Sequence, residues 1–333
     1  MIRAKVYVLN KYFEGLPKKT DFKIIEEDLP PLKHEEFLAE ALYLSVDPYM
    51  RTAAARLKIG TPFIGYQVAR ITDSKSKEYP VGTFIVGAFG WRTHTVSNGK
   101  SNVSAYPGVW KVPDLKKLPL SLAIGMVGRV GNTAYFGLLE ICKPKHGETV
   151  VVSAAGGAVG SHVGQIAKIK GCKVIGITST DYKGEWLVNE LGFDCFVNYK
   201  KPNFLDTLKK CTPEGIDCYF DNVGGEISST VMSIMNQYGR ISVCGSISCY
   251  NATAPVLAPI VQISIVSLEL KLEGYIVHRW ADRWQEGILQ NLTWIQEGKL
   301  KYKETVTEGF ENTVSAFIEM LEGKNIGKSI VKI

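Results

Sequence analysis

The stretch Thr149-Val-Val-Val-Ser-Ala-Ala-Gly-Gly-Ala-Val-Gly-Ser161 decides the fold. Its first part, Thr149–Ala154, is an uninterrupted apolar run, as expected for a strand that is buried on both faces of a parallel sheet. A helix-like segment, Ala158–Lys170, follows at once. The stretch therefore predicts a buried strand, a tight glycine turn and a helix, in that order.

The glycines of this turn have the spacing of a dinucleotide-binding fingerprint. Gly157 and Gly160 occupy its second and third glycine positions, and Ala155 occupies the first. The second glycine lets the backbone approach a pyrophosphate, and the third lets helix and strand pack closely. The unpaired N–H groups at the helix N-terminus then favour a phosphate. An ordinary tight turn is the alternative, but the flanking strand and helix favour dinucleotide binding.

The same alternation of strands and helices continues downstream from about Leu122. A strand, helix, strand repeat of this kind is typical of a doubly wound parallel sheet in an α/β protein. The predicted strands are Thr149–Ala154, Lys173–Thr178, Cys195–Asn198, Asp217–Asp221, Arg240–Gly245 and Leu272–Val277, and the predicted helices are Ala158–Lys170, Lys183–Leu191, Phe204–Cys211 and Ile227–Met235.

The first part of the chain, to about Ser121, has a different pattern, with short β-like runs separated by Pro and Gly. This pattern predicts a small antiparallel, barrel-like domain. The runs are Ala4–Leu9, Glu36–Leu44, Gly65–Ile71, Thr83–Phe89 and Trp110–Val112. A final apolar strand, Lys328–Ile333, is expected to rejoin this domain.

The end of the second strand of the parallel sheet distinguishes NADP from NAD. An acidic residue there would bind the ribose 2′-hydroxyl and repel a 2′-phosphate. The sequence instead has Ile177-Thr-Ser-Thr-Asp-Tyr-Lys183, with small hydroxyl residues and a lysine that can reach a phosphate. We interpret Asp181 as a helix N-cap. The pattern favours NADP(H).

Composition and charge exclude several classes of protein. The net charge of +6 over 333 residues is mild and the basic residues are interspersed with acids, which argues against nucleic-acid binding. Met1–Tyr12 lacks the apolar core of a secretory signal. Pro259–Leu272, an apolar stretch, is too short and too charged to span a membrane. Seven cysteines without framework spacing indicate reduced thiols in a cytoplasmic protein.

The sequence offers no zinc-binding pattern. None of the five histidines pairs with a nearby cysteine at ligand spacing. Cys244 is interpreted as a buried, inert thiol rather than a nucleophile. Trp280 and Trp284 are assigned to the core or to an interface. A metal-free hydride transfer suits an enone, because conjugation spreads the developing negative charge and a hydroxyl donor then suffices.

Several further motifs resemble the medium-chain dehydrogenase/reductase superfamily, and within it the prostaglandin reductase branch, also called leukotriene 12-hydroxydehydrogenase or alkenal/one reductase. They span nearly the whole chain. They are Tyr43-Leu-Ser-Val-Asp-Pro-Tyr-Met-Arg51, Thr133-Ala-Tyr-Phe-Gly-Leu-Leu-Glu140, Asp217-Cys-Tyr-Phe-Asp-Asn-Val-Gly-Gly225, Gly239-Arg-Ile-Ser-Val-Cys-Gly245, Glu308-Gly-Phe-Glu-Asn312 and Asn325-Ile-Gly-Lys328.

The resemblance implies a GroES-like β-barrel domain over 1–121, an NADP-binding Rossmann domain over 122–308, and a return to the first domain over 309–333. It also implies a homodimer. Matched residue by residue, it implies cofactor contacts at Gly157, Ala158, Val159, Gly160, Lys183, Tyr199, Asn222, Cys244, Gly245, Ser246, Ile247, Ser248, Cys249, Tyr250, Tyr275, Ile276, Val277 and Asn325.

The implied reaction is NADPH-dependent reduction of the carbon–carbon double bond of an α,β-unsaturated ketone or aldehyde, such as a 15-oxo-prostaglandin or a 2-alkenal, with leukotriene 12-hydroxy dehydrogenation as a related activity. Tyr49, Arg56 and Tyr250 match positions near the family's substrate cleft. Arg56 is expected to attract a fatty-acid carboxylate, and Tyr250 to line the reacting end and to support the enolate. A surface arginine and packed tyrosines are the alternative interpretation.

Three positions depart from the family pattern. Val130 replaces a proline and Asn132 an apolar residue, both close to the expected nicotinamide, and Ser267 replaces a tyrosine. These departures weaken the inference of a prostaglandin substrate. Two other functions stay open, a quinone reductase of the same superfamily and a non-catalytic NADPH-binding protein.

Overall fold

The computed structural model describes residues 2–100 and 108–333, and the chain divides into two compact units. Unit 1 comprises the described residues of Met1–Gly125 and Glu304–Ile333, and unit 2 comprises Met126–Lys303. Met1 and residues 101–107 of the predicted 1–121 domain lie outside the described residues.

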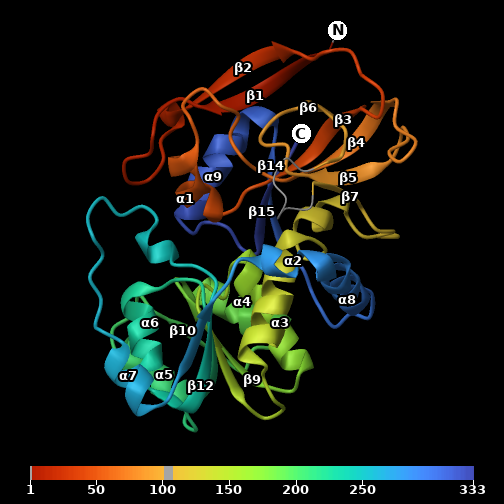
Figure 1. Cartoon of the computed structure of the whole chain (residues 1–333). Coiled ribbons are helices and arrows are strands. Elements are labelled where there is room, and N and C mark those ends of the chain that lie inside the picture. The colour runs from red at the N-terminus through yellow and green to blue at the C-terminus, as the bar shows by residue number, and fades with distance from the viewer. Residues whose placement is uncertain (1, 101–107) are drawn as a thin grey trace. The chain divides into compact units, whose positions relative to one another are not determined.

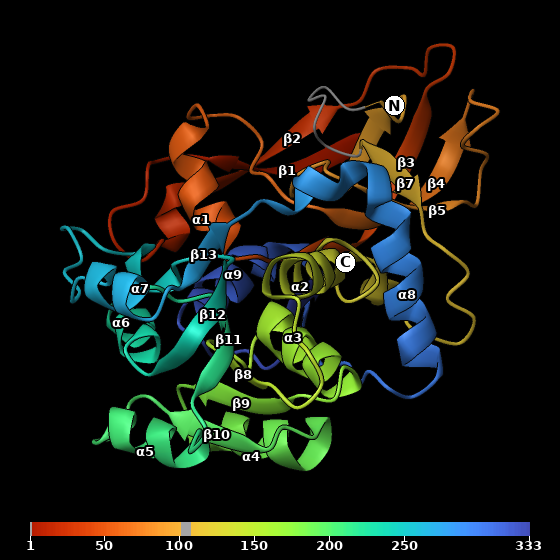
Figure 2. The same ribbon diagram turned by 60° about the horizontal axis from the view of Figure 1, so that its bottom comes forward.

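Unit 2 contains a six-stranded parallel sheet with the strand order β10-β9-β8-β11-β12-β13. Figure 2 shows this row of strands, with α4 and α5 beyond its β10 end. The order is that of the classic dinucleotide-binding fold. The strands are β8 (Thr149–Val152), β9 (Lys173–Thr178), β10 (Cys195–Asn198), β11 (Ile216–Asp221), β12 (Met235–Val243) and β13 (Lys271–Gly274).

Helices cover both faces of this sheet, with α3 and α4 on one side and α5 and α6 on the other (Figure 1). The predicted doubly wound sheet is thereby confirmed. The helices of unit 2 are α2 (Arg129–Phe136), α3 (Ala158–Ile169), α4 (Asp181–Leu191), α5 (Phe204–Cys211), α6 (Gly225–Met232), α7 (Gln262–Ser267) and α8 (Trp284–Gln296), with the π-helical turn η4 (Gly137–Cys142) and the 3-10 turns η5 (Ile247–Cys249) and η6 (Val277–Arg283).

The strand order places a topological switch point between β8 and β11. From β8 the chain moves outward through β9 and β10, whereas β11, β12 and β13 extend the sheet in the other direction. Ligands of open α/β sheets bind in the crevice that this reversal leaves at the carboxyl ends of the strands. The glycine turn follows β8 directly and therefore lies at this edge.

Unit 1 is rich in antiparallel sheet, as the short runs predict. One sheet has the order β14-β15-β3-β4-β5-β7, with β6 also paired to β3, and a separate ribbon joins β1 to β2. Its strands are β1 (Arg3–Leu9), β2 (Phe22–Asp28), β3 (Phe37–Ser45), β4 (Gln67–Ser74), β5 (Phe84–Gly87), β6 (His94–Ser97), β7 (Val109–Lys111), β14 (Glu304–Glu308) and β15 (Lys328–Lys332), and its helices and turns are η1 (Lys19–Asp21), α1 (Tyr49–Ala53), η2 (Ala54–Arg56), η3 (Leu120–Ile124), η7 (Phe310–Asn312) and α9 (Thr313–Leu321).

An aromatic core stabilises unit 1. Phe63 and Trp91 are fully buried with ring centroids 4.5 Å apart, and Phe317 of α9 packs 5.6 Å from Trp91. Aromatic pairs at these separations contribute beyond the area that they bury. The final strand β15 pairs antiparallel with β3, as expected for a returning tail.

Two predicted elements of unit 2 extend three residues beyond their observed ends. The helix predicted to reach Met235 ends at Met232, and Met235 opens β12 opposite Ile216 of β11. The strand predicted to reach Val277 ends at Gly274. Apolar residues at a boundary fit a helix, a strand or a turn equally well, so their pattern does not fix the ends of an element.

The prediction that all seven cysteines are reduced thiols is wrong for this structure. Cys195 and Cys211 form a disulfide, with their Cα atoms 6.1 Å apart. The residues are 16 positions apart in sequence, but β10 and α5 pack together and bring them within disulfide range. The other five cysteines are free.

Candidate functional site

The glycine turn of unit 2 has the close packing that a phosphate-binding loop requires. Gly157 is the N-cap of α3, and a Cβ atom at Gly160 would lie 2.4 Å from the Ala154 carbonyl oxygen. Only glycine at position 160 therefore lets α3 pack against the turn. The first N–H groups of α3 have no partner within the helix, and they face the end of the turn with a partial positive charge.

Lys183 lies against this turn. It is in the first turn of α4, and a Cβ atom at Gly156 would lie 3.0 Å from Cδ of the lysine. Burial and the nearby positive charge of Lys200 lower the pKa of Lys183. An anion at this position would restore the favourable environment of the ammonium group, so the geometry fits a phosphate.

The predicted helix cap beside this lysine is corrected by one residue. Thr180, not Asp181, is the N-cap of α4, and its hydroxyl accepts a hydrogen bond from Lys183 N at 3.3 Å. The Asp181 carboxylate instead accepts from Asn198 Nδ2 at 3.0 Å and pairs with Lys201 at 2.6 Å. These contacts offset the negative charge of the Asp181 carboxylate, so it would repel a phosphate beside Lys183 less strongly.

Tyr199 follows β10 at the same edge of the sheet. Its backbone N–H donates to the Thr178 carbonyl oxygen at 3.0 Å, which ties it to the end of β9. The residue is 38% exposed, so part of it is accessible to a ligand.

A buried carboxylate that sequence reasoning missed organises the end of β11. Asp221 is 3% exposed and accepts from the Ser153 and Tyr219 hydroxyls and from the N–H groups of Val223 and Gly224, at 2.9–3.2 Å. The acidic residue in Phe220-Asp-Asn-Val-Gly-Gly225 was the available signal, because a carboxylate before a glycine pair often caps a turn.

This network positions Asn222 at the switch point. Asn222 donates its backbone N–H to Ser153 Oγ at 2.9 Å and its side-chain Nδ2 to the Ser153 carbonyl oxygen at 2.8 Å. The hydrogen bonds join the turn after β11 to the turn after β8. The predicted site residues Gly157, Gly160, Lys183, Tyr199 and Asn222 thus share one edge of unit 2.

The segment 244–250 is anchored on the turn after β11. Ser248 Oγ donates to the Val223 carbonyl oxygen at 2.6 Å, and the Tyr250 hydroxyl accepts from Ser246 N at 3.3 Å. The Tyr250 ring covers Gly245, since a Cβ atom there would lie 2.9 Å from the hydroxyl oxygen. Burial raises the pKa of Tyr250, so its phenol stays protonated at neutral pH.

Cys244 as a whole residue is half-buried, its sulfur is buried as expected, and it follows β12 rather than lying inside it. Burial of the sulfur raises its pKa to about 11. The thiol therefore stays protonated at neutral pH and is a poor nucleophile. Ile247 and Cys249 belong to η5 of the same segment.

The predicted run Tyr275–Val277 has mixed environments. The Tyr275 hydroxyl donates to the Thr133 carbonyl oxygen at 2.7 Å, Ile276 is 66% exposed, and Val277 is buried. Trp280 and Trp284 are both buried, and the Trp280 ring stacks on Phe136, which confirms them as core residues.

Three predicted site residues belong to unit 1. Tyr49 opens α1 and packs against the aromatic core, Arg56 ends η2 and is exposed, and Asn325 Nδ2 donates to the Gly327 carbonyl oxygen at 2.8 Å. The Tyr49 environment agrees with a packed tyrosine and that of Arg56 with a surface arginine.

Asn132, one of the departures from the family pattern, has a structural explanation. It is fully buried in α2, donates Nδ2 to the Trp284 carbonyl oxygen at 2.9 Å, and fills space that a Cβ atom at Gly287 would occupy. Val130 is also buried, and Ser267 is exposed at the end of α7.

The residues present do not fit a zinc ion. Within 2–100 and 108–333, no three His, Cys, Asp or Glu side chains gather as a metal-binding group. No helix in those ranges is both long and apolar enough to cross a membrane.

Comparisons with known proteins agree with this geometry. Residues 5–104 match the family model of the N-terminal domain of oxidoreductase, and residues 158–294 match that of zinc-binding dehydrogenase. The second description does not carry over a metal site, since the ligand group it implies is absent from the part of the chain that the structure describes.

Full-length relatives are similar over the whole chain. Prostaglandin reductase 1 of Bos taurus is 51% identical, with 100% of both chains covered. The NADPH-dependent curcumin reductase of Escherichia coli is 35% identical, with 99% of this chain and 97% of the relative covered. The crystal structure of CurA from Vibrio vulnificus in complex with NADPH has a TM-score of 0.89 and 36% identity over 98% of each chain. The chain belongs to the prostaglandin reductase branch of the medium-chain dehydrogenase/reductase superfamily.

Proposed function

We propose that this protein reduces the carbon–carbon double bond of α,β-unsaturated ketones and aldehydes with NADPH. The observation that carries the proposal is the glycine turn at the switch point of unit 2, with Lys183 packed against Gly156. The NADPH complex of the CurA structure and the names of the prostaglandin and curcumin reductases support it.

Unit 2 would hold the cofactor. The pyrophosphate would lie against the turn formed by Gly157, Ala158, Val159 and Gly160. The 2′-phosphate and its ribose would lie beside Lys183 and Tyr199. Asn222 would lie at the centre of the crevice. The remaining proposed contacts in unit 2 are Cys244, Gly245, Ser246, Ile247, Ser248, Cys249, Tyr250, Tyr275, Ile276 and Val277, and Asn325 is a proposed contact from unit 1. When bound, NADPH supplies the hydride that reduces the β-carbon of the enone.

The residues of this chain then stabilise the negative charge on the carbonyl oxygen. In its hydrogen bond with Ser246 N the Tyr250 hydroxyl accepts, which leaves its own proton to be donated to an enolate oxygen. Its raised pKa makes Tyr250 a donor rather than a base. Solvent protonates the α-carbon, so the reaction does not require a fixed general acid.

Unit 1 would supply substrate contacts through Tyr49 and Arg56. The exposed guanidinium of Arg56 suits the carboxylate of a fatty-acid chain. We assign the substrate domain to unit 1, close to the predicted 1–121 and 309–333, and the NADP-binding domain to unit 2, close to the predicted 122–308. Small enones and lipid-derived alkenals are the proposed substrate class. The proposed compartment is the cytoplasm.

We also propose a homodimer. The edge strand β13 pairs only with β12 among the described strands, and apolar side chains are exposed near it. A second copy that pairs with this edge would cover the open backbone groups of the strand.

Turnover assays test the activity. Purified protein is mixed with NADPH and either 15-oxo-prostaglandin or 4-hydroxynonenal, the absorbance of NADPH is followed, and the products are identified by mass spectrometry. We expect consumption of NADPH, much slower consumption of NADH, and a product with a saturated carbon–carbon bond and an intact carbonyl group.

The two substrates also rank the lipid-mediator role against the detoxifying role. A failure to oxidise NADPH with either compound contradicts the enone activity. Turnover with quinones in the same assay would then identify a quinone reductase, and heat protection by NADPH without turnover would identify a non-catalytic binding protein.

A further inference from the structure

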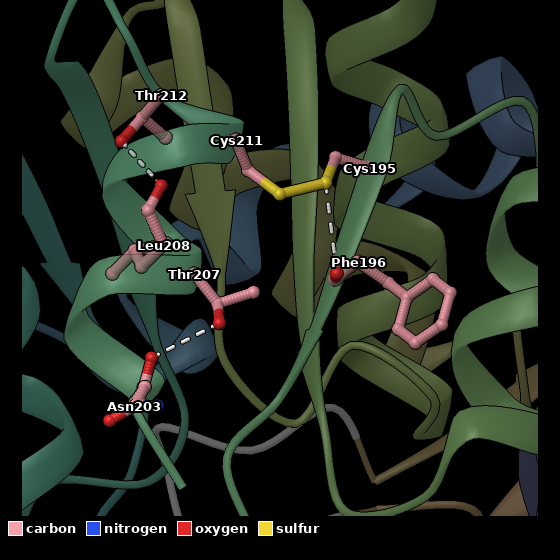
Figure 3. The surroundings of a disulfide bond; sticks show 7 residues. All are labelled: Cys195, Phe196, Asn203, Thr207, Leu208, Cys211 and Thr212. Carbon is pink, nitrogen blue, oxygen red and sulfur yellow. Dashed lines mark hydrogen bonds between the residues drawn. A yellow bond between two sulfur atoms is a disulfide. The ribbon is translucent and has the colours of Figure 1, made fainter. Parts of the chain in front are cut away.

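The disulfide between Cys195 and Cys211 closes a strand–loop–helix hairpin, formed by β10, the loop 199–203 and α5, beside the proposed cofactor site. Cys195 is the first residue of β10 and Cys211 the last of α5, so the link joins the two ends of the segment 195–211 (Figure 3). At the opposite end of the hairpin, the loop 199–203 leads from β10 into α5 and begins with Tyr199. The link and the proposed ligand contact thus belong to one structural element.

Helix α5 has few other contacts that hold it in place. It has eight residues, and Leu208 is its one fully buried side chain. Phe204 and Cys211 pack only partly against the core of unit 2. A short helix with one buried anchor is a low-stability element, so a covalent link at its end has a large effect on its docking.

The loop of the hairpin carries positive charge to the edge where Lys183 lies. Lys201 pairs with Asp181 at 2.6 Å, and Asn198 donates to the same carboxylate at 3.0 Å. The charge of Lys200 is close enough to Lys183 to lower the pKa of that lysine. The position of this hairpin therefore fixes both Tyr199 and the charge around the proposed 2′-phosphate.

Three of the five other cysteines are poorly placed for oxidation. Burial raises the pKa of Cys172 and Cys244 to about 11, and a hydrogen bond with Cys142 raises that of the buried Cys218. Thiols that stay protonated react slowly with disulfides. Cys172 is free and lies outside the proposed cofactor contacts, so it serves as the comparison.

We propose that Cys195 and Cys211 are a reversible redox modification site, and that its oxidation by a small disulfide such as glutathione disulfide tightens the binding of NADPH. This inference rests on the proposed function, because it places the 2′-phosphate beside Lys183 and Tyr199. The oxidised pair holds α5 on β10, so the loop 199–203 is preorganised for the cofactor.

The chemistry is ordinary thiol–disulfide exchange. One cysteine thiolate attacks glutathione disulfide, which releases a glutathione thiolate and leaves a mixed disulfide on the protein. The second cysteine thiolate attacks the protein sulfur of this bond and releases the second glutathione. Two S–H bonds are lost and one S–S bond forms in the protein. The two electrons and two protons end on two molecules of reduced glutathione.

The test measures the link and the affinity on the same full-length samples. The protein is equilibrated in buffers of different glutathione disulfide to glutathione ratio, and the Cys195–Cys211 peptide pair is quantified by mass spectrometry without reduction. The Kd for NADPH is measured by fluorescence, together with KM for NADPH and kcat with an enone. We expect the Kd and KM to be roughly three- to tenfold lower in the oxidised protein, with kcat unchanged.

Two variants and one control sharpen the result. Cys195→Ser and Cys211→Ser should each keep the affinity of the reduced protein at every glutathione ratio, whereas Cys172→Ser, at a free cysteine outside the proposed cofactor contacts, should respond as the unmodified chain does. No link at any ratio, equal affinities in the two states, or a lost response in Cys172→Ser would each overturn the inference. Redox-dependent NADPH binding without enone turnover would instead refute the proposed activity and leave this site standing.

Discussion

The charge of Lys183 should discriminate between NADPH and NADH. The lysine packs against the phosphate-binding turn, and a contact with a charged group contributes about 1.5–3 kcal/mol. We therefore expect Lys183→Ala to raise KM for NADPH by about 10- to 100-fold and to leave KM for NADH unchanged. Steady-state kinetics with both cofactors measure this ratio.

The control for this substitution is Lys170→Ala, which removes an equal charge from an exposed position at the end of α3. It should leave both KM values unchanged. Equal increases for NADPH and NADH in Lys183→Ala would show that the lysine supports the turn and does not bind the 2′-phosphate.

The stability of unit 2 should depend on the protonation of a buried histidine. His162 in α3 is fully buried, its Nε2 lies 3.0 Å from Asn291 Oδ1, and burial lowers its pKa from 6.5 to about 4. Above pH 6.5 the side chain is neutral in the folded and the unfolded chain. As the pH falls from about 6.5 to about 4, only the unfolded chain takes up the proton, and the folded state loses roughly 3 kcal/mol.

Urea unfolding at pH 7.5 and at pH 5 measures this loss. His162→Gln should lose about 2 kcal/mol less on acidification than the unmodified chain, because its buried group cannot be protonated. His278, whose pKa is also lowered to about 4 by burial, contributes equally to both proteins and cancels in the comparison. The same acid sensitivity in both proteins would contradict the assignment.

At the scale of the element, the two glycines of the turn should separate cofactor binding from folding. A Cβ atom at Gly160 would lie 2.4 Å from a backbone carbonyl oxygen, whereas one at Gly157 would lie 3.3 Å from it. Gly160→Ala should therefore cost about 1–3 kcal/mol of folding free energy. Gly157→Ala should keep most of the stability and raise KM for NADPH, because its methyl group lies where the backbone meets the pyrophosphate. Urea unfolding and cofactor kinetics on the two variants test this separation, and equal stability losses would contradict it.

The elements of unit 2 were largely predictable from the sequence. Thr149–Val152 is a continuous apolar run, Gly192 ends α4 in a left-handed conformation, and strong helix and strand patterns alternate between them. In unit 1, strand β14 was missed because Glu304–Glu308 has one apolar residue, Val306, which is exposed, so the strand is recognisable mainly through its pairing with β15. Boundaries near Met235 and Val277 were wrong because apolar residues there suit either state.

The site was predictable where a residue acts through its own backbone or charge, and not where it acts through distant partners. The Gly157–Gly160 turn is local in sequence and carries its own signal. The local turn of Phe220–Gly225 signals a capping carboxylate, but the Asp221 network also depends on Ser153, which lies 68 positions away, so the local pattern does not reveal its link to the turn after β8. The Cys195–Cys211 link was missed for the same reason, since it depends on how α5 packs on β10.

At the scale of the whole molecule, the exposed edge of the six-stranded sheet is the feature that bears on assembly. Strand β13 has a partner on one side among the described strands, and Leu272 on it is partly exposed. In the neighbouring helix α7, Ile263 and Val266 are 69% and 76% exposed, and Leu257 before it is 90% exposed. Several large apolar side chains exposed on one short part of the chain are typical of an interaction site.

We expect the unmodified chain to sediment as a dimer, at twice the 36.8 kDa of one chain. The double variant Ile263→Asp/Val266→Asp should sediment as a monomer. Two charges on each copy would face two charges on its partner in a symmetric interface, so each substitution acts twice. Leu289→Asp, an equally polar change on the exposed face of α8, should leave the dimer intact. Sedimentation velocity at micromolar concentration distinguishes these outcomes. An unmodified chain that sediments as a monomer contradicts the dimer. A double variant that stays dimeric shows instead that the exposed side chains of α7 lie outside the interface. A dimer through the sheet edge would then depend on β13 alone.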